Sequence, residues 1–381
     1  MSRFFLNLFI VNILIDPVNS LLNIKIITFF LCIITNIKKV YISFERLSIF
    51  IVFYIIFFIS TAFMLFRNIN YDIDFLKTYS TTFLTLAIFF IDPLKINIIP
   101  GLKIATIFIT CSTNFFSILA YFFPEVKILF LLDNGLGGIF RSIENKHIFN
   151  WTIIGIYHRA SAILVFPFAL MWCSFLKKQK IKYMIYTIMI GLALFFSGTR
   201  ANIFSVILII FLIYTYYIFF KKRMLQTVFL LCFSGFLIVI GTFLFITVKN
   251  DSSLVKDGHL FSYIDLFRNN IIYLLIGQGP GSYFYTKGYN MEATNTELSY
   301  LELIRMFGLF SSVIIMFYYI LPFLKIKNYN KNYSFVVAIA YLAYLFIAGT
   351  NPLLIGPTGF MAIWIAYTLL SQINAVSNKI I

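Results

Sequence analysis

Apolar runs of about membrane-spanning length follow one another along almost the whole sequence. A helix needs about 20 apolar residues to cross a hydrocarbon core about 30 Å thick. Hydrophobic residues make up 61% of the 381 positions and charged residues 12%, whereas soluble domains carry about 25% charged residues. The sequence therefore predicts an all-α, polytopic integral membrane protein.

Polar clusters divide the chain into about twelve transmembrane helices. We expect them near residues 4–20, 22–37, 47–66, 79–94, 104–123, 152–176, 183–197, 201–220, 225–247, 299–322, 333–349 and 357–373. Asp16 and Pro17 leave open whether the first two runs form two spans or one kinked segment. No cleavage site follows the first run, so we expect it to be retained. No repeat or linker interrupts residues 1–381, which predicts a single domain.

Lysine and arginine are distributed unevenly between the two sets of connecting segments. With the N-terminus inside, 18 of the 30 Lys and Arg and 2 of the 14 Asp and Glu are cytoplasmic, counting Lys25 within the second run. The outer side holds the other 12 of each kind, so the whole net charge of +16 is cytoplasmic. This bias orients the protein. The basic balance indicates contact with anionic lipid, and no nucleic-acid partner is expected.

Three arginines lie at the outer ends of different apolar runs. Arg159, Arg200 (in "FFSGTRANIF") and Arg305 each lie about 27–31 Å along a helix from lysines at its other end. An arginine at the bilayer centre costs about 2.5–3.5 kcal/mol on insertion scales, so an intramembrane arginine is a functional-site candidate. The alternative is that each extends to the interface as an ordinary surface cation.

The longest polar segment, residues 249–298, falls on the outer side. Its stretch "LFSYIDLFRNNIIYLLIG" predicts an amphipathic helix on the membrane surface, with Asp265 and Arg268 on the polar side. The apolar positions at helical spacing are Leu260, Phe261, Ile264, Phe267, Ile271, Leu274 and Leu275. The "GQGPG" that follows predicts a tight turn, because no strand precedes it as a dinucleotide motif requires.

Three motifs carry a resemblance to a known family. In order they are "SGTRANI" at the head of a run, "GQGPGSY" in the large outer loop, and "ELSYLELIRMFGLF" leading into the next run. This order resembles the bacterial O-antigen and capsule repeat-unit polymerases and the related O-antigen ligases, over about the C-terminal two-thirds of the chain. In the ligases a His-Asn pair precedes the last motif's Tyr-Leu. This sequence has Glu297 there, which favours a polymerase.

The resemblance implies a GT-C-like glycosyltransferase, multi-pass in the bacterial inner (cytoplasmic) membrane, with its active site facing the periplasm. Such an enzyme joins undecaprenyl-pyrophosphate-linked oligosaccharide repeat units in lipopolysaccharide or capsule biosynthesis. The resemblance also leaves room for a partner that regulates chain length.

Chemistry assigns roles to the charged residues under this resemblance. Arginine binds phosphate oxygens through a bidentate fork, so Arg200 and Arg305 would stabilise the departing pyrophosphate. Glu297 would accept the proton of the attacking sugar hydroxyl. The other substrate-binding candidates are Arg159, His158, Arg268, Lys287, Glu292 and Glu302. His158 is equally well interpreted as a helix cap, and Glu292 and Glu302 are rivals for the role of base.

Three alternatives stay open. "YDID", with Asp72 and Asp74, would fit a metal-dependent transferase that uses a polyprenyl-phosphate sugar, or is simply a solvated connector. A ligase or a non-enzymatic flippase would handle similar lipid-linked sugars; transporters, however, commonly show repeats and midplane sites. Neither metal nor cofactor is expected, because the cysteines lie singly in apolar runs, at Cys32, Cys111, Cys173 and Cys232.

Overall fold

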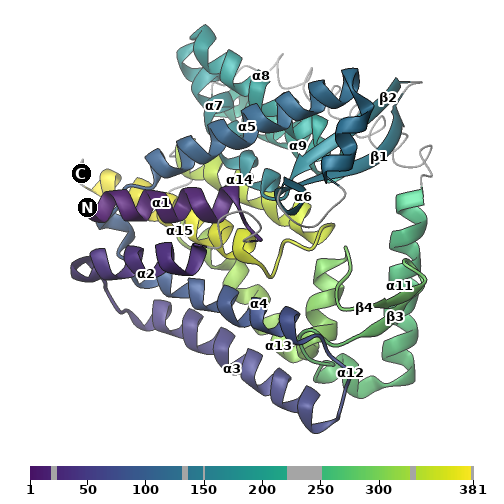
Figure 1. Ribbon diagram of the computed structural model, residues 1–381. Coiled ribbons are helices and arrows are strands. Elements are labelled where there is room, and N and C mark those ends of the chain that lie inside the picture. Colours follow the sequence, from purple (N-terminus) through teal and green to yellow (C-terminus); the bar gives the residue numbers. More distant parts are fainter. Residues whose placement is uncertain (19–23, 131–135, 149–150, 221–250, 327–331, 379–381) are drawn as a thin grey trace.

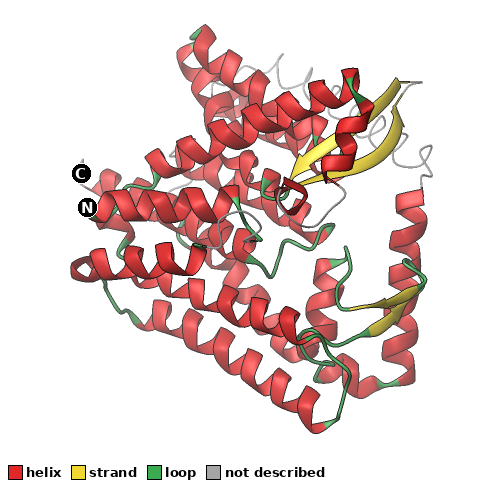
Figure 2. Cartoon of the chain, in the orientation of Figure 1, coloured by secondary structure: helices red, strands yellow, loops and turns green. Residues whose placement is uncertain are grey.

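The computed structural model describes residues 1–18, 24–130, 136–148, 151–220, 251–326 and 332–378 (Figure 1). Helices dominate this part of the chain, together with two small two-stranded sheets (Figure 2). Five described helices are long and apolar enough to cross a membrane: Phe44–Phe66, Ile99–Phe122, Ser161–Lys178, Arg200–Ile218 and Ser299–Leu324. This supports a helical, membrane-embedded protein; the number twelve and the GT-C likeness stay predictions.

The elements follow one another in a simple order. The helices are α1 (Ser2–Ile15), α2 (Lys25–Thr35), α3 (Phe44–Phe66), α4 (Ile73–Leu84), α5 (Ile99–Phe122), α6 (Leu136–Ile139), α7 (Val165–Lys178), α8 (Ile181–Phe196), α9 (Arg200–Phe220), α11 (Asp251–Asn269), α12 (Ile271–Leu275), α13 (Ser299–Leu324), α14 (Asn332–Gly349) and α15 (Pro357–Asn378). Short 3-10 helices are η1 (Ile37–Lys39), η2 (Thr85–Phe90), η3 (Pro93–Lys95), η4 (Pro124–Phe130) and η5 (Ser161–Leu164). The strands are β1 (Phe140–Ile148), β2 (Trp151–His158), β3 (Phe284–Thr286) and β4 (Met291–Ala293).

The first two apolar runs form a short helical hairpin. Asn36 Nδ2 donates to Ser2 O at 3.2 Å, so the end of α2 lies beside the start of α1. Asn12 Nδ2 donates to Thr28 Oγ1 at 3.1 Å between the two helices. With 14 and 11 residues, α1 and α2 rise only about 21 Å and about 17 Å. Each is shorter than the hydrocarbon core, so the two runs form two short helices, and neither crosses the core alone.

Lys25 lies at the tip of this hairpin. Its Nζ donates to Pro17 O at 2.5 Å, and its side chain is buried. The charge count from the sequence placed Lys25 on the cytoplasmic side. In the structure Lys25 lies at the opposite end of α2 from Asn36, away from the start of α1. Burial lowers its pKa to about 8, while the nearby Asp16 carboxylate opposes that shift.

The expected helix over residues 152–176 is wrong in its first part. Residues Trp151–His158 form strand β2, which pairs antiparallel with β1, and the helical segment begins only at Ser161. The stretch "WTIIGIYH" is rich in β-branched and aromatic residues, which favour strands. A short apolar run can form either a strand or a buried helix segment, and hydrophobicity alone does not distinguish them. The strand was therefore predicted as the first part of a helix.

Two further expected spans need comment. The run over 79–94 contains the end of α4 and then η2 and η3, so it is not one continuous helix. The expected span over 225–247 and the basic cluster at 221–223 lie outside the described residues.

The connecting segments gather at two ends of the helix bundle. Both chain termini lie at one end (Figure 1). At this terminus end, Lys325 Nζ contacts Glu45 Oε2 at 2.6 Å, and Gln372 Nε2 donates to Pro93 O at 2.8 Å. These contacts join segments that the charge pattern assigns to one side of the membrane.

At the other end, which we call the loop end, the outer-loop segments meet. Asp72 N donates to Gly281 O at 2.9 Å, and Lys256 Nζ donates to Thr350 O at 3.3 Å. Helix α11 runs across this end, steeply inclined to α3 and α5 (Figure 1). The helix expected over residues 260–277 is present as α11 and α12, interrupted at Asn270, which caps α12.

Helices α14 and α15 lie in the bundle core, and the core holds the loop between them in place. Residues 358–370 of α15 are buried without interruption. From the core, the hydroxyl of Tyr319 donates to Leu354 O and that of Tyr344 to Leu353 O. Buried tyrosines satisfy their hydroxyls in this way, which fixes the 350–358 loop beside the cavity described next.

Candidate functional site

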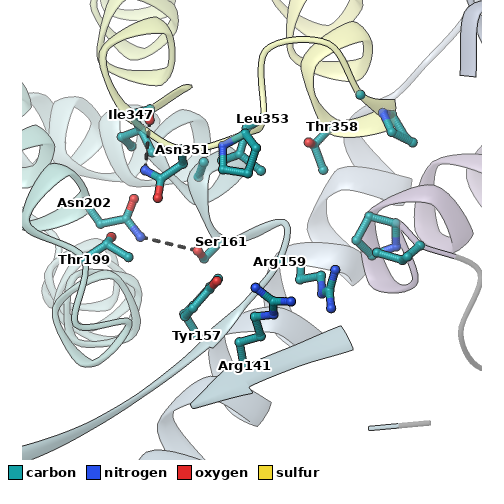
Figure 3. A pocket seen from close by; sticks show the side chains of 16 residues that line it. Arg141, Tyr157, Arg159, Ser161, Thr199, Asn202, Ile347, Asn351, Leu353 and Thr358 are labelled. Carbon is teal, nitrogen blue, oxygen red and sulfur yellow. Dashed lines mark hydrogen bonds between the residues drawn. The ribbon is translucent and has the colours of Figure 1, made fainter. Parts of the chain in front are cut away.

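A cavity of about 180 Å³ lies where the β1–β2 hairpin, the start of α9 and the α14–α15 loop meet (Figure 3). Its polar lining combines two arginines with hydroxyl and amide groups. The lining residues are Pro17, Val18, Arg141, Tyr157, Arg159, Ser161, Ala162, Thr199, Asn202, Ile347, Asn351, Pro352, Leu353, Gly356, Pro357 and Thr358.

The base of the hairpin supplies the basic wall. Arg141 on β1 is paired in register with Tyr157 on β2, and Arg159 N donates to Ile139 O at 2.9 Å just beyond the strand. Side chains alternate between the faces of a strand, so Tyr157 and Arg159 share one face and Arg141 lies opposite Tyr157 on it. All three point into the same space (Figure 3).

The segment "SGTRANI" supplies the facing wall. Gly198, at φ +66°, adopts the left-handed conformation that ends α8. Helix α9 then starts at once, which brings Thr199 and Asn202 to the cavity. Asn202 Nδ2 donates to Ser197 Oγ at 2.8 Å and to Ser161 Oγ at 3.3 Å. Its Oδ1 is buried and has no hydrogen-bond partner among the described residues, which leaves one acceptor available to a ligand.

The end of α1 also reaches the cavity. Pro17 and Val18, directly after α1, line it. The α14–α15 loop, which lines it too, belongs to the loop end, where Lys256 Nζ donates to Thr350 O at 3.3 Å. The two guanidinium groups therefore line a cavity that adjoins the outer-loop segments.

Tyr157 connects the cavity electrostatically to the outer loop. Burial raises the pKa of its hydroxyl, and the Arg141 and Arg159 guanidiniums oppose that shift. The Glu297 carboxylate acts on the same hydroxyl and raises its pKa. Contacts agree with this proximity, because Lys256 Nζ pairs with Glu297 Oε2 at 3.6 Å and donates to Thr350 O, beside the cavity-lining Asn351, at 3.3 Å.

The sequence candidates separate into distinct groups. Arg159 lines the cavity, where it can contact a ligand. Arg200 begins α9 next to Thr199 but does not line the cavity itself. The structure thus brings two of the three predicted arginines to one region, while Arg305 lies elsewhere.

His158 is a buried structural residue. Its Nε2 donates to Ile15 O at 2.9 Å, and its Nδ1 accepts from Ala160 N at 3.0 Å. Only the neutral imidazole can make both bonds. Burial lowers its pKa to about 3. Both ring nitrogens are occupied by the backbone, so the structure favours the fold-stabilising interpretation over sugar binding.

Arg305 lies in a closed network beneath the outer loop. It is 0% exposed. Its Nη1 donates to Gln278 Oε1 at 3.0 Å and to Ser282 Oγ at 2.7 Å. Its Nη2 donates to Thr294 O at 2.9 Å.

Glu302 completes this network. It accepts from Arg305 Nε at 3.0 Å and from Nη2 at 2.5 Å, and also from the hydroxyl of Tyr263 on α11. The guanidinium lies 4.4 Å from the Phe284 ring centroid. With every nitrogen of Arg305 engaged, binding a phosphate there would require breaking an internal bond. These bonds indicate that Arg305 and Glu302 fasten the outer loop to α13.

The remaining predicted charges lie on the outer loop. Lys287 Nζ pairs with Asp265 Oδ2 at 2.5 Å, both about half exposed. Arg268 on α11 and Glu292 on β4 are exposed. Glu297 pairs with Lys256 Nζ at 3.6 Å, and about a third of each side chain is accessible. Among these, Glu297 is the one whose charge acts on a cavity residue.

Arg141, Tyr157 and Asn202 were missed as candidates. Asn202 stands two residues after Arg200 in "SGTRANI", so the motif itself contained the signal. Arg141 and Tyr157 gave none, because their proximity depends on the β1–β2 pairing that the sequence did not reveal.

A scan of the sequence against protein-family models found no match, and a search of curated proteins found none either.

Proposed function

We propose that this protein is a membrane polysaccharide polymerase that joins oligosaccharide repeat units carried on undecaprenyl pyrophosphate. The observation that carries the proposal is the cavity lined by two arginines, Arg141 and Arg159, together with hydroxyl and amide groups. The motif order noted in the sequence supports the same class.

The cavity suits a lipid pyrophosphate headgroup. Arg141 and Arg159 offer planar forks that match phosphate oxygens and stay charged. Thr199 directly precedes α9, at the helix N-terminus, where an anion is favoured. Ile347 and Leu353 supply apolar surface for the first part of a lipid tail. Stabilising the charge that develops on a departing pyrophosphate is the contribution that such fixed cations make to catalysis.

The sugars of the repeat unit would lie toward the outer loop and Glu297. Lys256 Nζ pairs with Glu297 Oε2 at 3.6 Å and donates to Thr350 O at 3.3 Å. Thr350 directly precedes the cavity-lining Asn351, so the contacts of Lys256 connect Glu297 to the cavity wall.

Glu297 fits the role of general base. In the proposed reaction a hydroxyl oxygen of the acceptor sugar forms a bond to the anomeric carbon of the donor. The bond from that carbon to the pyrophosphate oxygen breaks, and its electron pair leaves with undecaprenyl pyrophosphate. Glu297 takes the hydroxyl proton, a role that requires a carboxylate within reach of the acceptor. Its partial exposure leaves it accessible to that sugar.

Two experiments test this function. In a deletion strain, surface glycan reduced to single repeat units on the lipid anchor is the expected result. Complete absence of surface sugar would indicate a flippase, and polymer retained on undecaprenyl lipid would indicate a ligase; either result would refute the polymerase.

Binding of undecaprenyl pyrophosphate to the purified protein tests the cavity directly. Arg141→Ala and Arg159→Ala should each weaken binding by about tenfold to a hundredfold, as loss of a charge-assisted hydrogen bond implies. Arg268→Ala, an exposed arginine on α11, is the matched control and should bind normally. Equal affinities for all four proteins would exclude the cavity as the headgroup site.

A further inference from the structure

The β3–β4 hairpin presents a fixed tyrosine ring at the loop end. The backbone N–H of Tyr289 donates to Thr286 Oγ1 at 3.2 Å. Its ring meets that of His259 edge-on, with centroids 4.4 Å apart. His259 Nδ1 is itself 2.8 Å from Thr286 Oγ1, so one hydroxyl holds both rings. Tyr289 is 39% exposed, which leaves part of its ring open.

Close packing against α11 fixes the position of this turn. A Cβ atom on Gly288 would lie 2.3 Å from Val255 O, and one on Gly258 would lie 2.7 Å from the Gly288 backbone. Only glycine at both positions allows the hairpin to approach the helix this closely. Asn290, at φ +53°, completes the tight turn. The turn that carries Tyr289 is therefore held against α11, and the ring itself packs on His259.

Contacts with α11 place Tyr289 near the candidate base. Gly288, its neighbour in the chain, packs against Val255 of α11. The next residue, Lys256, pairs with Glu297 Oε2 at 3.6 Å and donates to Thr350 O at 3.3 Å, next to the cavity-lining Asn351. Burial raises the pKa of the Tyr289 hydroxyl to about 12, and the Glu297 carboxylate contributes in the same direction. Arg141 and Tyr157, both cavity-lining, also act on this hydroxyl. Tyr289 and the proposed base therefore contact the same stretch of α11, residues 255–259.

We propose that the ring of Tyr289 is a binding platform for the acceptor saccharide, held so that an acceptor hydroxyl faces Glu297. This inference rests on the proposed function and specifies where the second substrate binds. A sugar ring has an apolar C–H face and a polar rim, and a tyrosine offers a matching apolar face with a polar hydroxyl. Tyr289 does not line the cavity, so a saccharide on its ring would lie outside the proposed headgroup site.

The test is a two-substrate assay with purified protein. The donor is lipid-linked repeat unit extracted from a deletion strain, and the acceptor is the same repeat unit released from its lipid by mild acid. Tyr289→Ala should raise the KM for the acceptor by about tenfold, the upper range for loss of a stacked aromatic contact. Tyr289→Phe keeps the ring face and should stay within about twofold of wild type. Affinity for undecaprenyl pyrophosphate should be unchanged in both variants.

Tyr285 provides a matched control on the same hairpin. It is 54% exposed on the outer face of β3, and Tyr285→Ala should leave the acceptor KM unchanged. An unchanged acceptor KM in Tyr289→Ala would overturn the platform, as would equal impairment by Tyr289→Ala and Tyr285→Ala. These failures are distinct from failure of the proposed function, in which the wild-type protein itself would neither bind undecaprenyl pyrophosphate nor transfer sugar.

Discussion

Replacing Arg305 by alanine should destabilise the protein without directly removing a ligand contact. The substitution leaves the Glu302 carboxylate, 3% exposed, with the Tyr263 hydroxyl as its remaining side-chain partner in the network. It also removes the bonds that hold Gln278 and Ser282. The outer loop would then lose its attachment to α13.

The expected magnitude follows from this geometry. Removing one partner of a buried ion pair costs about 3–5 kcal/mol, because the other charge stays buried without compensation. An unfolding entropy of about 2.1 cal/mol/K per residue over 381 residues gives about 0.8 kcal/mol per degree. The apparent Tm should therefore fall by about 4–6 °C. Arg305→Met combined with Glu302→Gln removes both charges and should recover at least half of that loss.

Thermal unfolding of the detergent-solubilised protein, followed by intrinsic fluorescence, measures this directly. Limited proteolysis should show faster cleavage within residues 277–297 of Arg305→Ala. A normal Tm for Arg305→Ala together with lost binding of undecaprenyl pyrophosphate would refute the structural role and restore Arg305 as a phosphate ligand.

Three further predictions follow from other residues. Burial holds the pKa of His158 near 3, against 6.5 for an ordinary histidine, so the unfolded chain binds more protons between these values and stability falls as pH drops through this window. Between pH 7 and pH 4.5 the wild type should lose about 2–3 kcal/mol more than His158→Asn; identical pH dependence of Tm would contradict this. Glu297→Gln should reduce transfer by at least about a hundredfold with unchanged donor binding, whereas Glu292→Gln should transfer normally; the reverse pattern would move the base to Glu292. In intact cells an impermeant maleimide should label Arg268→Cys but not Lys178→Cys, and the opposite labelling would invert the topology.

Features governed by local pattern were predictable from the sequence. The apolar runs coincide with the five described helices that are long and apolar enough to cross a membrane, although one of these runs began in a strand. The apolar spacing over residues 260–275 predicted a helix where α11 and α12 lie. Segments assigned to one side by lysine content, such as those holding Lys325 and Glu45, do lie together. Local signals succeed here because length, helical periodicity and charge act over one or two turns.

Features governed by long-range pairing were not predictable. The sequence analysis assigned β2 to a helix and β1 to the loop before it. Of the three residues in the basic wall, Arg141, Tyr157 and Arg159, it therefore predicted only Arg159 as a site residue. An apolar strand packed against membrane helices has the composition of a helix, and nothing local separates the two.

Arg305 shows the same limit for charge. In sequence it matched Arg159 and Arg200 in depth, and depth alone suggested a common role. Its partners Gln278 and Ser282 are 27 and 23 residues away in the chain and meet it only after the loop folds back. Whether a buried arginine binds substrate or fastens a loop depends on such partners, which a linear pattern does not reveal.

The most direct test of the central claim is a cryo-electron microscopy structure of the protein with undecaprenyl pyrophosphate in lipid nanodiscs. The account predicts the two phosphates inside the cavity, with oxygens about 2.7–2.9 Å from the guanidinium nitrogens of Arg141 and Arg159. The lipid tail should leave the cavity along its apolar side, past Ile347 and Leu353. A pyrophosphate bound elsewhere, for example on the exposed Arg268, with no ligand density between Arg141 and Arg159, would contradict it.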